Sequence, residues 1–237
     1  MHKRAALALG VILSLSQPVS AQAAGSASGL SGSIFKLMNQ VGTLQPPASG
    51  GQKAAVPAPV VQPAALNFKV SPAIRQKVIN TFVAQISEGS PEAGAEWNKL
   101  FKATDVFAEV DKQVKAMFGL SATNLADTWA VYWSYAWLMT QSRTDDPSKA
   151  QVVGLRNQFQ PILRALPSVA ALTDAQKQEM SDTLMLQVVM FGALAEAWKD
   201  DQASRDEFGA GLRGGTQEMG LDLGAVTLSD QGFKVTP

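Results

Sequence analysis

The sequence predicts an all-α fold, a single bundle-like domain of six or seven helices preceded by a signal peptide and a disordered Pro/Ala/Gly-rich linker. Three observations favour this class. Apolar residues recur every three or four positions through most of the chain after residue 67. Helix start and stop signals separate these segments. About 170 residues remain for the domain, which is enough for one hydrophobic core.

Residues 1–23 are typical of a secretory signal peptide. A basic start at residues 2–4 precedes an apolar stretch at 5–16 that is too short to span a membrane. Residues 21–23, Ala-Gln-Ala, fit the small-residue pattern of cleavage sites, so we expect cleavage after Ala23. An uncleaved membrane anchor is the alternative, and the short apolar stretch disfavours it. The protein is therefore expected in the periplasm or outside the cell.

Composition excludes most familiar enzyme chemistry from the mature chain. The sequence has no cysteine, and its one histidine, His2, lies in the signal peptide. Such a chain has no Ser-His-Asp triad, no cysteine nucleophile, no His or Cys zinc ligand and no disulfide. Once Lys3 and Arg4 are removed, 18 basic residues face 20 acidic ones, which gives no electrostatic footprint for nucleic acid. We expect no cofactor, no metal site and no transmembrane segment in the mature chain.

Residues 24–66 are expected to form a linker. Gly, Ser, Ala, Pro and Gln dominate this stretch, and such a composition cannot bury enough apolar surface to offset the entropy of ordering it. One amphipathic stretch interrupts the linker at 30–41. It is interpreted either as a transient helix that packs weakly on the domain or as a short docking segment for a partner.

The first three helices are expected at the start of the domain, which covers residues 67–237. Ser71, followed by proline, signals the start of a helix over about 72–87, and Ser90 repeats that signal for a short second helix. Thr104 is expected to cap the third helix, which a glycine ends.

The next two helices have their own start signals. Asn124 opens a fourth helix over about 124–141. Asp146 and the proline after it are expected to open a fifth helix, in which Pro161 should produce a kink or a break.

A long sixth helix and a weaker seventh helix complete the prediction. Thr173 and Gln176 fit a capping box that opens the sixth helix. Four glycines weaken the seventh, at about 203–219, and the tail at 225–235 is expected to be a short extended segment or a hairpin. The fourth and sixth helices are apolar on nearly every side, so we expect them to cross inside the others.

The most distinctive local feature is a stripe of three tryptophans, Trp129, Trp133 and Trp137. Their spacing of four places the indoles on one side of the fourth helix. Such a stripe can stack sugar rings or line a site for an apolar ligand, so these residues are ligand-binding candidates. The alternative, which the apolar flanking residues favour, is that the stripe belongs to the core.

Carboxylates are the only catalytic candidates, and the sequence singles out Asp127 and Glu179. A carboxylate in an apolar segment, such as Asp127, can act as a general acid or base. As the third residue of its helix, it is also placed to accept a backbone N–H near the helix start. Asp127, Glu179 and Asp182 together suit a Ca²⁺ or Mg²⁺ site or glycoside hydrolysis. Nothing in their spacing requires them to meet, and first-turn and solvent-facing charge explains them more simply.

Arg75 is a further ligand-binding candidate. It lies one turn into the first helix among apolar positions, where it can pair with Asp127 or Glu179 in the interior. A buried ion pair of this kind is weak evidence for function.

Four short segments are distinctive in combination. They are SPAIR at 71–75, NLAD at 124–127 followed by Tyr132-Trp133 and Trp137, KQEM at 177–180, and LSDQGF at 228–233. Together they resemble a family of secreted bacterial proteins of unknown function, over about residues 66–233. The resemblance implies export, a variable linker and a helical domain. It implies no activity, cofactor or catalytic residue.

These observations favour a non-enzymatic exported module that binds a partner protein or a component of the bacterial envelope. One alternative is a carboxylate-dependent hydrolase of cell-wall glycan, with the tryptophan stripe as sugar platform and Asp127 or Glu179 as acid or base. That enzyme needs two carboxylates about 5–10 Å apart in a cleft that exposes an indole. A further alternative is a carrier of an apolar ligand, which needs a cavity between the fourth and sixth helices.

Overall fold

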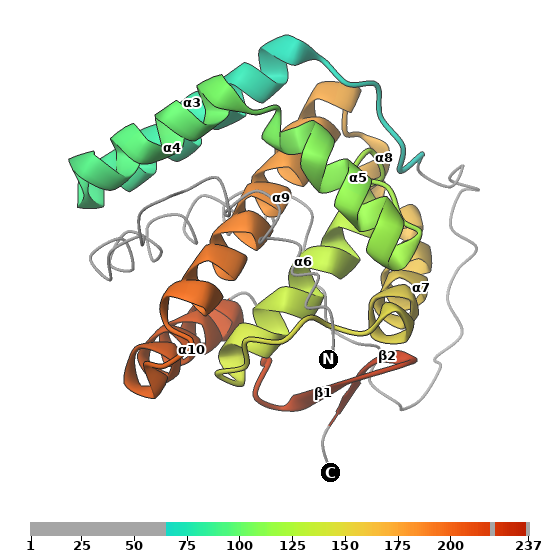
Figure 1. Cartoon of the computed structure of the whole chain (residues 1–237). Coiled ribbons are helices and arrows are strands. Elements are labelled where there is room, and N and C mark those ends of the chain that lie inside the picture. The colour runs from blue at the N-terminus through green and yellow to red at the C-terminus, as the bar shows by residue number, and fades with distance from the viewer. Residues whose placement is uncertain (1–64, 219–220, 236–237) are drawn as a thin grey trace, which may run out of the picture.

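A computed structural model describes residues 65–218 and 221–235 of the chain, and this part is predominantly helical, as the sequence predicts (Figure 1). The predicted signal peptide, the linker up to residue 64 and the predicted helix at 30–41 lie outside the described residues. The helices of the described part are α3 (Pro72–Gly89), α4 (Pro91–Ala103), α5 (Val106–Phe118), α6 (Leu125–Thr140), α7 (Lys149–Ala165), α8 (Pro167–Ala170), α9 (Asp174–Ala197) and α10 (Gln202–Glu218). Its strands are β1 (Val226–Ser229) and β2 (Gly232–Val235).

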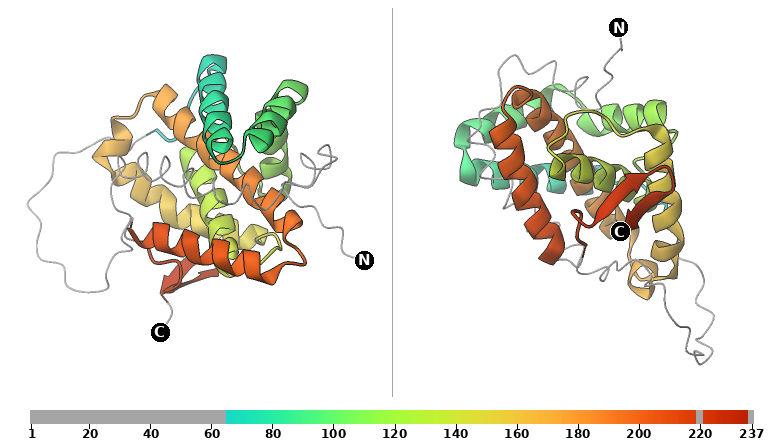
Figure 2. Two further views of the ribbon diagram at one scale, coloured as in Figure 1. Left: turned by 90° about the vertical axis from the view of Figure 1, so that its left-hand side faces the viewer. Right: turned by 90° about the horizontal axis from the view of Figure 1, so that it is seen from below.

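Helices α6 and α9 cross at the centre, and the other helices surround them (Figures 1 and 2). Every residue of α6 is buried, and α9 is buried along most of its length. The sequence of α6 and the 184–194 segment of α9 are apolar on nearly every side, so exposing any side of them to water would raise the free energy. The predicted crossing of these two helices is confirmed. Helices α7 and α10 pack against α6, and α3 packs against α9.

Helices α3 and α4 form an antiparallel pair that stands out from the other helices (Figures 1 and 2). We call this pair, residues 72–103, the helical arm. Its seam holds an aromatic cluster in which Phe82 meets Trp97 at 5.1 Å and Phe101 at 6.0 Å between ring centroids. The helices approach closely where Gly94 faces Ser87, because a Cβ atom at Gly94 would lie 1.9 Å from the Ser87 hydroxyl oxygen.

The tail forms a β-hairpin, one of the two forms the sequence predicts. Strands β1 and β2 are antiparallel and pack against α7. The side chain of Gln158 in α7 accepts the N–H of Phe233 at 2.8 Å and donates to its carbonyl at 3.0 Å, as a neighbouring strand would. Gly154 lets the hairpin turn approach α7, because a Cβ there would lie 2.3 Å from the Asp230 carbonyl oxygen.

Two predicted helix caps are wrong. Asp105, not Thr104, caps α5, and its carboxylate accepts the N–H three residues on at 3.0 Å. Ser148, not Asp146, caps α7, where it forms a capping box with Gln151. A cap belongs to the residue whose side-chain oxygen reaches the free N–H groups of the first turn, and in both helices that residue lies further along the chain than predicted. The capping box predicted at the start of α9 is confirmed.

Pro161 does not break α7, which continues to Ala165. The proline is exposed in the second half of the helix, so its ring meets solvent. The carbonyl that loses its hydrogen bond belongs to Asn157, which is also exposed and can bond to water instead. A four-residue helix that the sequence did not predict, α8, follows at Pro167–Ala170.

Candidate functional site

The tryptophan stripe of α6 lies in the core. Trp129, Trp133 and Trp137 are 0, 1 and 8 % exposed. Trp129 packs edge-on against Phe159 of α7, and the Trp137 indole donates a hydrogen bond to the Val226 carbonyl at 2.9 Å. The stripe therefore holds α7 and the β-hairpin against α6, and it offers no solvent-facing indole on which a sugar ring can stack.

Two indole groups of the stripe carry a polar atom with no partner. The Nε1 atoms of Trp129 and Trp133 are buried and have no hydrogen-bond acceptor. Buried N–H donors in folded proteins are nearly always paired. Two unpaired donors one turn apart on α6, in the core of the domain, are therefore unusual.

Asp127 joins three parts of the molecule. It follows the N-cap Asn124, whose side chain accepts the first free N–H groups of α6. The Asp127 carboxylate accepts the N–H of Ser121 at 3.0 Å and a hydrogen bond from Arg156 of α7 at 3.1 Å. One carboxylate oxygen thus holds the loop before α6, and the other holds α7.

Glu179 lies near the surface in a different ion pair. Its carboxylate accepts two hydrogen bonds from the Lys77 ammonium, at 2.8 and 2.9 Å. Asp127 and Glu179 are therefore engaged by two different helices, α7 and α3. Within residues 65–218 and 221–235, no three carboxylates are grouped so that they can hold a metal ion.

The expected pairing of Arg75 with Asp127 or Glu179 is wrong. The Arg75 side chain lies 3.8 Å from the Asp182 carboxylate, and its guanidinium lies 4.9 Å above the ring of Phe107 in α5. Asp182 is three residues beyond Glu179, on the side of α9 that faces the interior. The rotation of α9 about its axis thus decides which carboxylate meets Arg75.

Asp182 belongs to a polar cluster between α3 and α9, formed by Ser71, Arg75, Gln178 and Asp182. Gln178 accepts the Ser71 N–H at 2.7 Å and donates to the Ser71 carbonyl and to the Asp182 carboxylate, both at 3.0 Å. Gln178 and Asp182 are 0 and 3 % exposed. The Arg75 Nε atom is buried without a hydrogen-bond partner. We call these four residues the Asp182 cluster.

The Asp182 carboxyl group is the titratable group of this cluster. Burial raises its pKa from 3.8 to about 6, and the charge of Asp105 adds to the increase. The hydrogen bond from Gln178 and the charge of Arg75 oppose it. Asp182 therefore changes its charge at about pH 6, at the junction of the helical arm with the rest of the domain.

Sequence reasoning missed Gln178 and did not place Asp182. A usable signal exists, because the two residues are spaced by four near the start of a helix that is otherwise mostly apolar, so they share one buried side. Ser71 occupies the N-cap position of α3, but its side chain makes no cap hydrogen bond. Its backbone groups are held by Gln178 instead.

Comparison with curated proteins and with solved structures finds no match. None of the described helices is both long and apolar enough to cross a membrane. A family model does match, over residues 2–236, and it extends beyond the 66–233 range of the resemblance at both ends. The chain therefore belongs to this family, a family of unknown function (DUF6683).

Proposed function

We propose that this protein is an exported helical module that binds a partner protein or a component of the bacterial envelope, and that it is not an enzyme. One observation carries the proposal. The side chains that were candidates for catalysis or ligand binding are already bonded or buried within the fold. Asp127 and Glu179 are engaged in ion pairs, Arg75 stacks on Phe107 beside Asp182, and the α6 indoles are buried. A surface that binds another molecule needs none of these groups to be free.

The hydrolase alternative requires two carboxylates in one cleft and an indole exposed beside them. The three α6 indoles are at most 8 % exposed, and Asp127 and Glu179 bond to different helices. These two observations favour binding over glycan hydrolysis.

Export is the first part of the proposal, and the mass of the protein tests it. We expect the protein produced in a bacterial host to appear in the periplasm or the medium with the mass of a chain that begins at Ala24. Ala23→Leu places a bulky residue before the cleaved bond and should leave the precursor uncut. Ala24→Leu, just after that bond, is the matched control and should be processed. A precursor mass in the cytoplasmic fraction of the wild-type culture would refute export.

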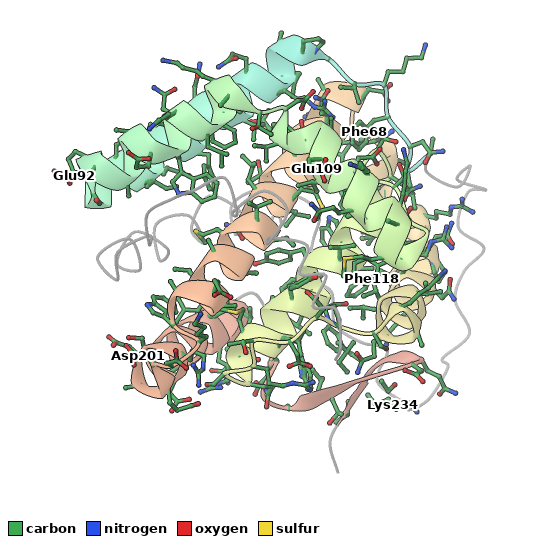
Figure 3. All side chains as sticks on the ribbon, in the orientation of Figure 1. Phe68, Glu92, Glu109, Phe118, Asp201 and Lys234 are labelled. Carbon is green, nitrogen blue, oxygen red and sulfur yellow. The ribbon has the colours of Figure 1, made fainter. Side chains whose placement is uncertain are left out.

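Binding is the second part, and photo-crosslinking in intact cells tests it. A photoreactive amino acid is placed in turn at exposed positions on different faces, for example Glu92 on the helical arm and Lys234 on the hairpin (Figure 3). We expect one discrete adduct that forms from one face and not from the other. Crosslinks from neither face would count against a partner.

A matched activity assay tests the hydrolase alternative. Release of soluble glycan from isolated cell wall is measured for the wild type and for Glu179→Gln, which keeps the size of a partly exposed side chain. We expect no release by either protein. Release by the wild type that the substitution abolishes would overturn the non-enzymatic proposal.

A second candidate, a carrier of an apolar ligand, is favoured by the unpaired indole donors. A bound molecule with an acceptor oxygen between α6 and its neighbours would satisfy the Nε1 atoms of Trp129 and Trp133. Native mass spectrometry of protein purified without detergent would then show added mass. Trp133→Phe removes one donor and should reduce retention of the ligand. Trp137→Phe is the control, because that indole already donates to Val226. A bare protein mass would refute this candidate.

A further inference from the structure

The helical arm has an apolar seam, whose buried side chains belong to the hydrophobic core of the domain. Its buried residues are Val78, Phe82 and Ile86 of α3 and Gly94, Trp97 and Leu100 of α4. The aromatic rings of Phe82, Trp97 and Phe101 lie in mutual contact at 5.1–6.0 Å. Because this seam joins α3 to α4, the two helices can stay paired while the arm moves as one body.

The arm is joined to the rest of the domain chiefly through α3. Helix α4 packs extensively against α3 alone, whereas α3 also packs along α9. The chain enters the arm through an extended segment that ends at Ser71 and leaves it through Thr104 and Asp105. Both connections lie at the same end of the arm, and the opposite end projects away from the core (Figures 1 and 2). This is the geometry of a hinged element.

Polar contacts hold the first two turns of α3, and the segment before them, on α9. Besides the Asp182 cluster, they include the ion pair of Lys77 with Glu179 and a hydrogen bond from the Lys69 N–H to Asp174 at 3.1 Å. All of them lie between the entry to α3 and its second turn. Unlike the apolar seam of the arm, these polar contacts depend on charges and hydrogen bonds, which respond to protonation.

Asp182 is the group in this attachment whose environment changes most if the arm moves. Asp182 is buried beside Arg75 of the docked arm, and its carboxylate accepts a hydrogen bond from Gln178. Arg75 lies at 3.8 Å without a hydrogen bond to it, so the ion pair compensates only part of the cost of burying the charge. Moving α3 away would admit water to the carboxylate.

We propose that the helical arm is a pH-responsive hinged element, held tightly on α9 while Asp182 carries a proton and held more loosely when Asp182 is ionised. This inference is independent of the proposed function. It concerns the attachment of the arm, whatever the protein binds.

The charges and burial around Asp182 decide whether docking of the arm strengthens or weakens as the pH rises. Arg75 of α3 attracts the ionised carboxylate, and Asp105 at the start of α5 repels it. On the exposed side, Lys77 of α3 and Glu179 of α9 compensate each other. Helix α6 contributes the neutral hydroxyl of Thr128, which donates a hydrogen bond to Ser181. Burial by the docked arm raises the pKa of Asp182, so docking binds a proton and weakens as the pH rises.

Hydrogen exchange of the full mature chain at pH 5.0 and 7.5, corrected for intrinsic exchange rates, tests the hinge. We expect the protection of arm amides relative to α6 amides to fall by about ten-fold over this range, as a proton-binding group with a pKa of about 6 docked and 3.8 exposed requires. Asp182→Asn, which stays neutral, should remove the pH dependence. Glu179→Gln, in the same attachment but outside the Asp182 cluster, should retain it. A pH-independent wild type, or a dependence that persists in Asp182→Asn, overturns the proposal.

A distance measurement decides the question if Asp182→Asn does not fold. The natural chain has no cysteine, so spin labels attach only where Glu92→Cys and Asp200→Cys are introduced, on the arm and beside Asp201 on the body (Figure 3). We expect a narrow distance distribution at pH 5.0 and a broader one at 7.5. A pair within the body, Asp200→Cys with Lys234→Cys, should not change. Equal arm–body distributions at both pH values would also overturn the proposal.

Discussion

The side-chain amide of Gln178 holds the backbone of Ser71 by both of its polar groups. Its oxygen accepts the Ser71 N–H at 2.7 Å, and its nitrogen donates to the Ser71 carbonyl at 3.0 Å. The two residues are 107 positions apart in the chain. A buried amide of α9 thus fixes the point at which the chain enters the helical arm, and it also donates to Asp182.

Gln178→Ala should destabilise the protein by about 2–3 kcal/mol, because it leaves the N–H and carbonyl of Ser71 and the Asp182 carboxylate short of a partner. Urea unfolding measures the change. Gln76→Ala is the control, since Gln76 donates a hydrogen bond to Asn80 on the exposed side of α3, and its effect should stay within about 0.5 kcal/mol. Equal effects of the two substitutions would contradict the role of Gln178.

Asp182→Asn should change how stability depends on pH. The pKa of Asp182 is raised to about 6 in the folded state from 3.8, so its contribution to stability is complete below pH 4 and is lost as the pH rises through 6. Relative to the wild type, Asp182→Asn should therefore become more stable from pH 4 to pH 7, by about 2 kcal/mol. Denaturant unfolding of both proteins at several pH values measures the difference. A constant difference would show that Asp182 is not perturbed.

The fluorescence of the mature protein should be blue-shifted and resistant to acrylamide. All five tryptophans are buried, and the most exposed, Trp137, is only 8 % exposed. Indoles shielded from water emit at shorter wavelength and meet the quencher rarely. Free tryptophan and the urea-unfolded protein are the references. Strong quenching in the native protein would restore the hypothesis of an exposed aromatic platform.

Trp133→Ala should cost about 3–5 kcal/mol, the usual cost of replacing a large buried aromatic side chain with alanine. Trp133 is 1 % exposed and packs edge-on against Tyr132 at 5.1 Å. Trp133→Phe keeps an aromatic ring and should cost less. The free energy of unfolding in urea is the measurement, and a near-neutral Trp133→Ala would mean that the stripe is not core.

Gly154→Ala should destabilise the packing of the β-hairpin on α7 by about 1–3 kcal/mol. The new Cβ would lie 2.3 Å from the Asp230 carbonyl oxygen, which is backbone and must shift. Gly211→Ala in α10 is the matched control. No atom lies within 4 Å of its new Cβ, so a better helix former should stabilise the protein by roughly 0.5–1 kcal/mol. Thermal unfolding measures both variants. We expect a lower melting temperature for Gly154→Ala and a higher one for Gly211→Ala.

Much of the helical architecture is predictable because it depends on local pattern. The crossing of α6 and α9 follows from two segments that are apolar on every side. The capping box of α9 follows from Thr173 and Gln176 three positions apart. The errors are also local. Neighbouring polar residues compete for a cap, and in α5 Asp105 takes the position that Thr104 was expected to fill.

The candidate site was predictable only in its residue types. Arg75 was expected to meet an acidic residue, but its partner is Asp182, three residues beyond Glu179 on the same helix. Periodicity places both acids near one face of α9. It does not show how α9 is rotated about its axis, and that rotation decides which acid faces Arg75 of α3. The bond between Gln158 and Phe233 is likewise invisible in the sequence, because it joins residues 75 positions apart.

The sequence alone determined that the domain is helical and which two helices are its centre, because hydrophobic periodicity and caps act over a few residues. It also determined that histidine and cysteine chemistry is absent from the mature chain, if the signal peptide is removed as expected. Only the tertiary structure decided that the tryptophan stripe is core, that Asp127 binds Arg156, and that Asp182 is buried under the helical arm. The physical reason is that burial and ion pairing depend on how helices far apart in the chain are rotated and packed against one another.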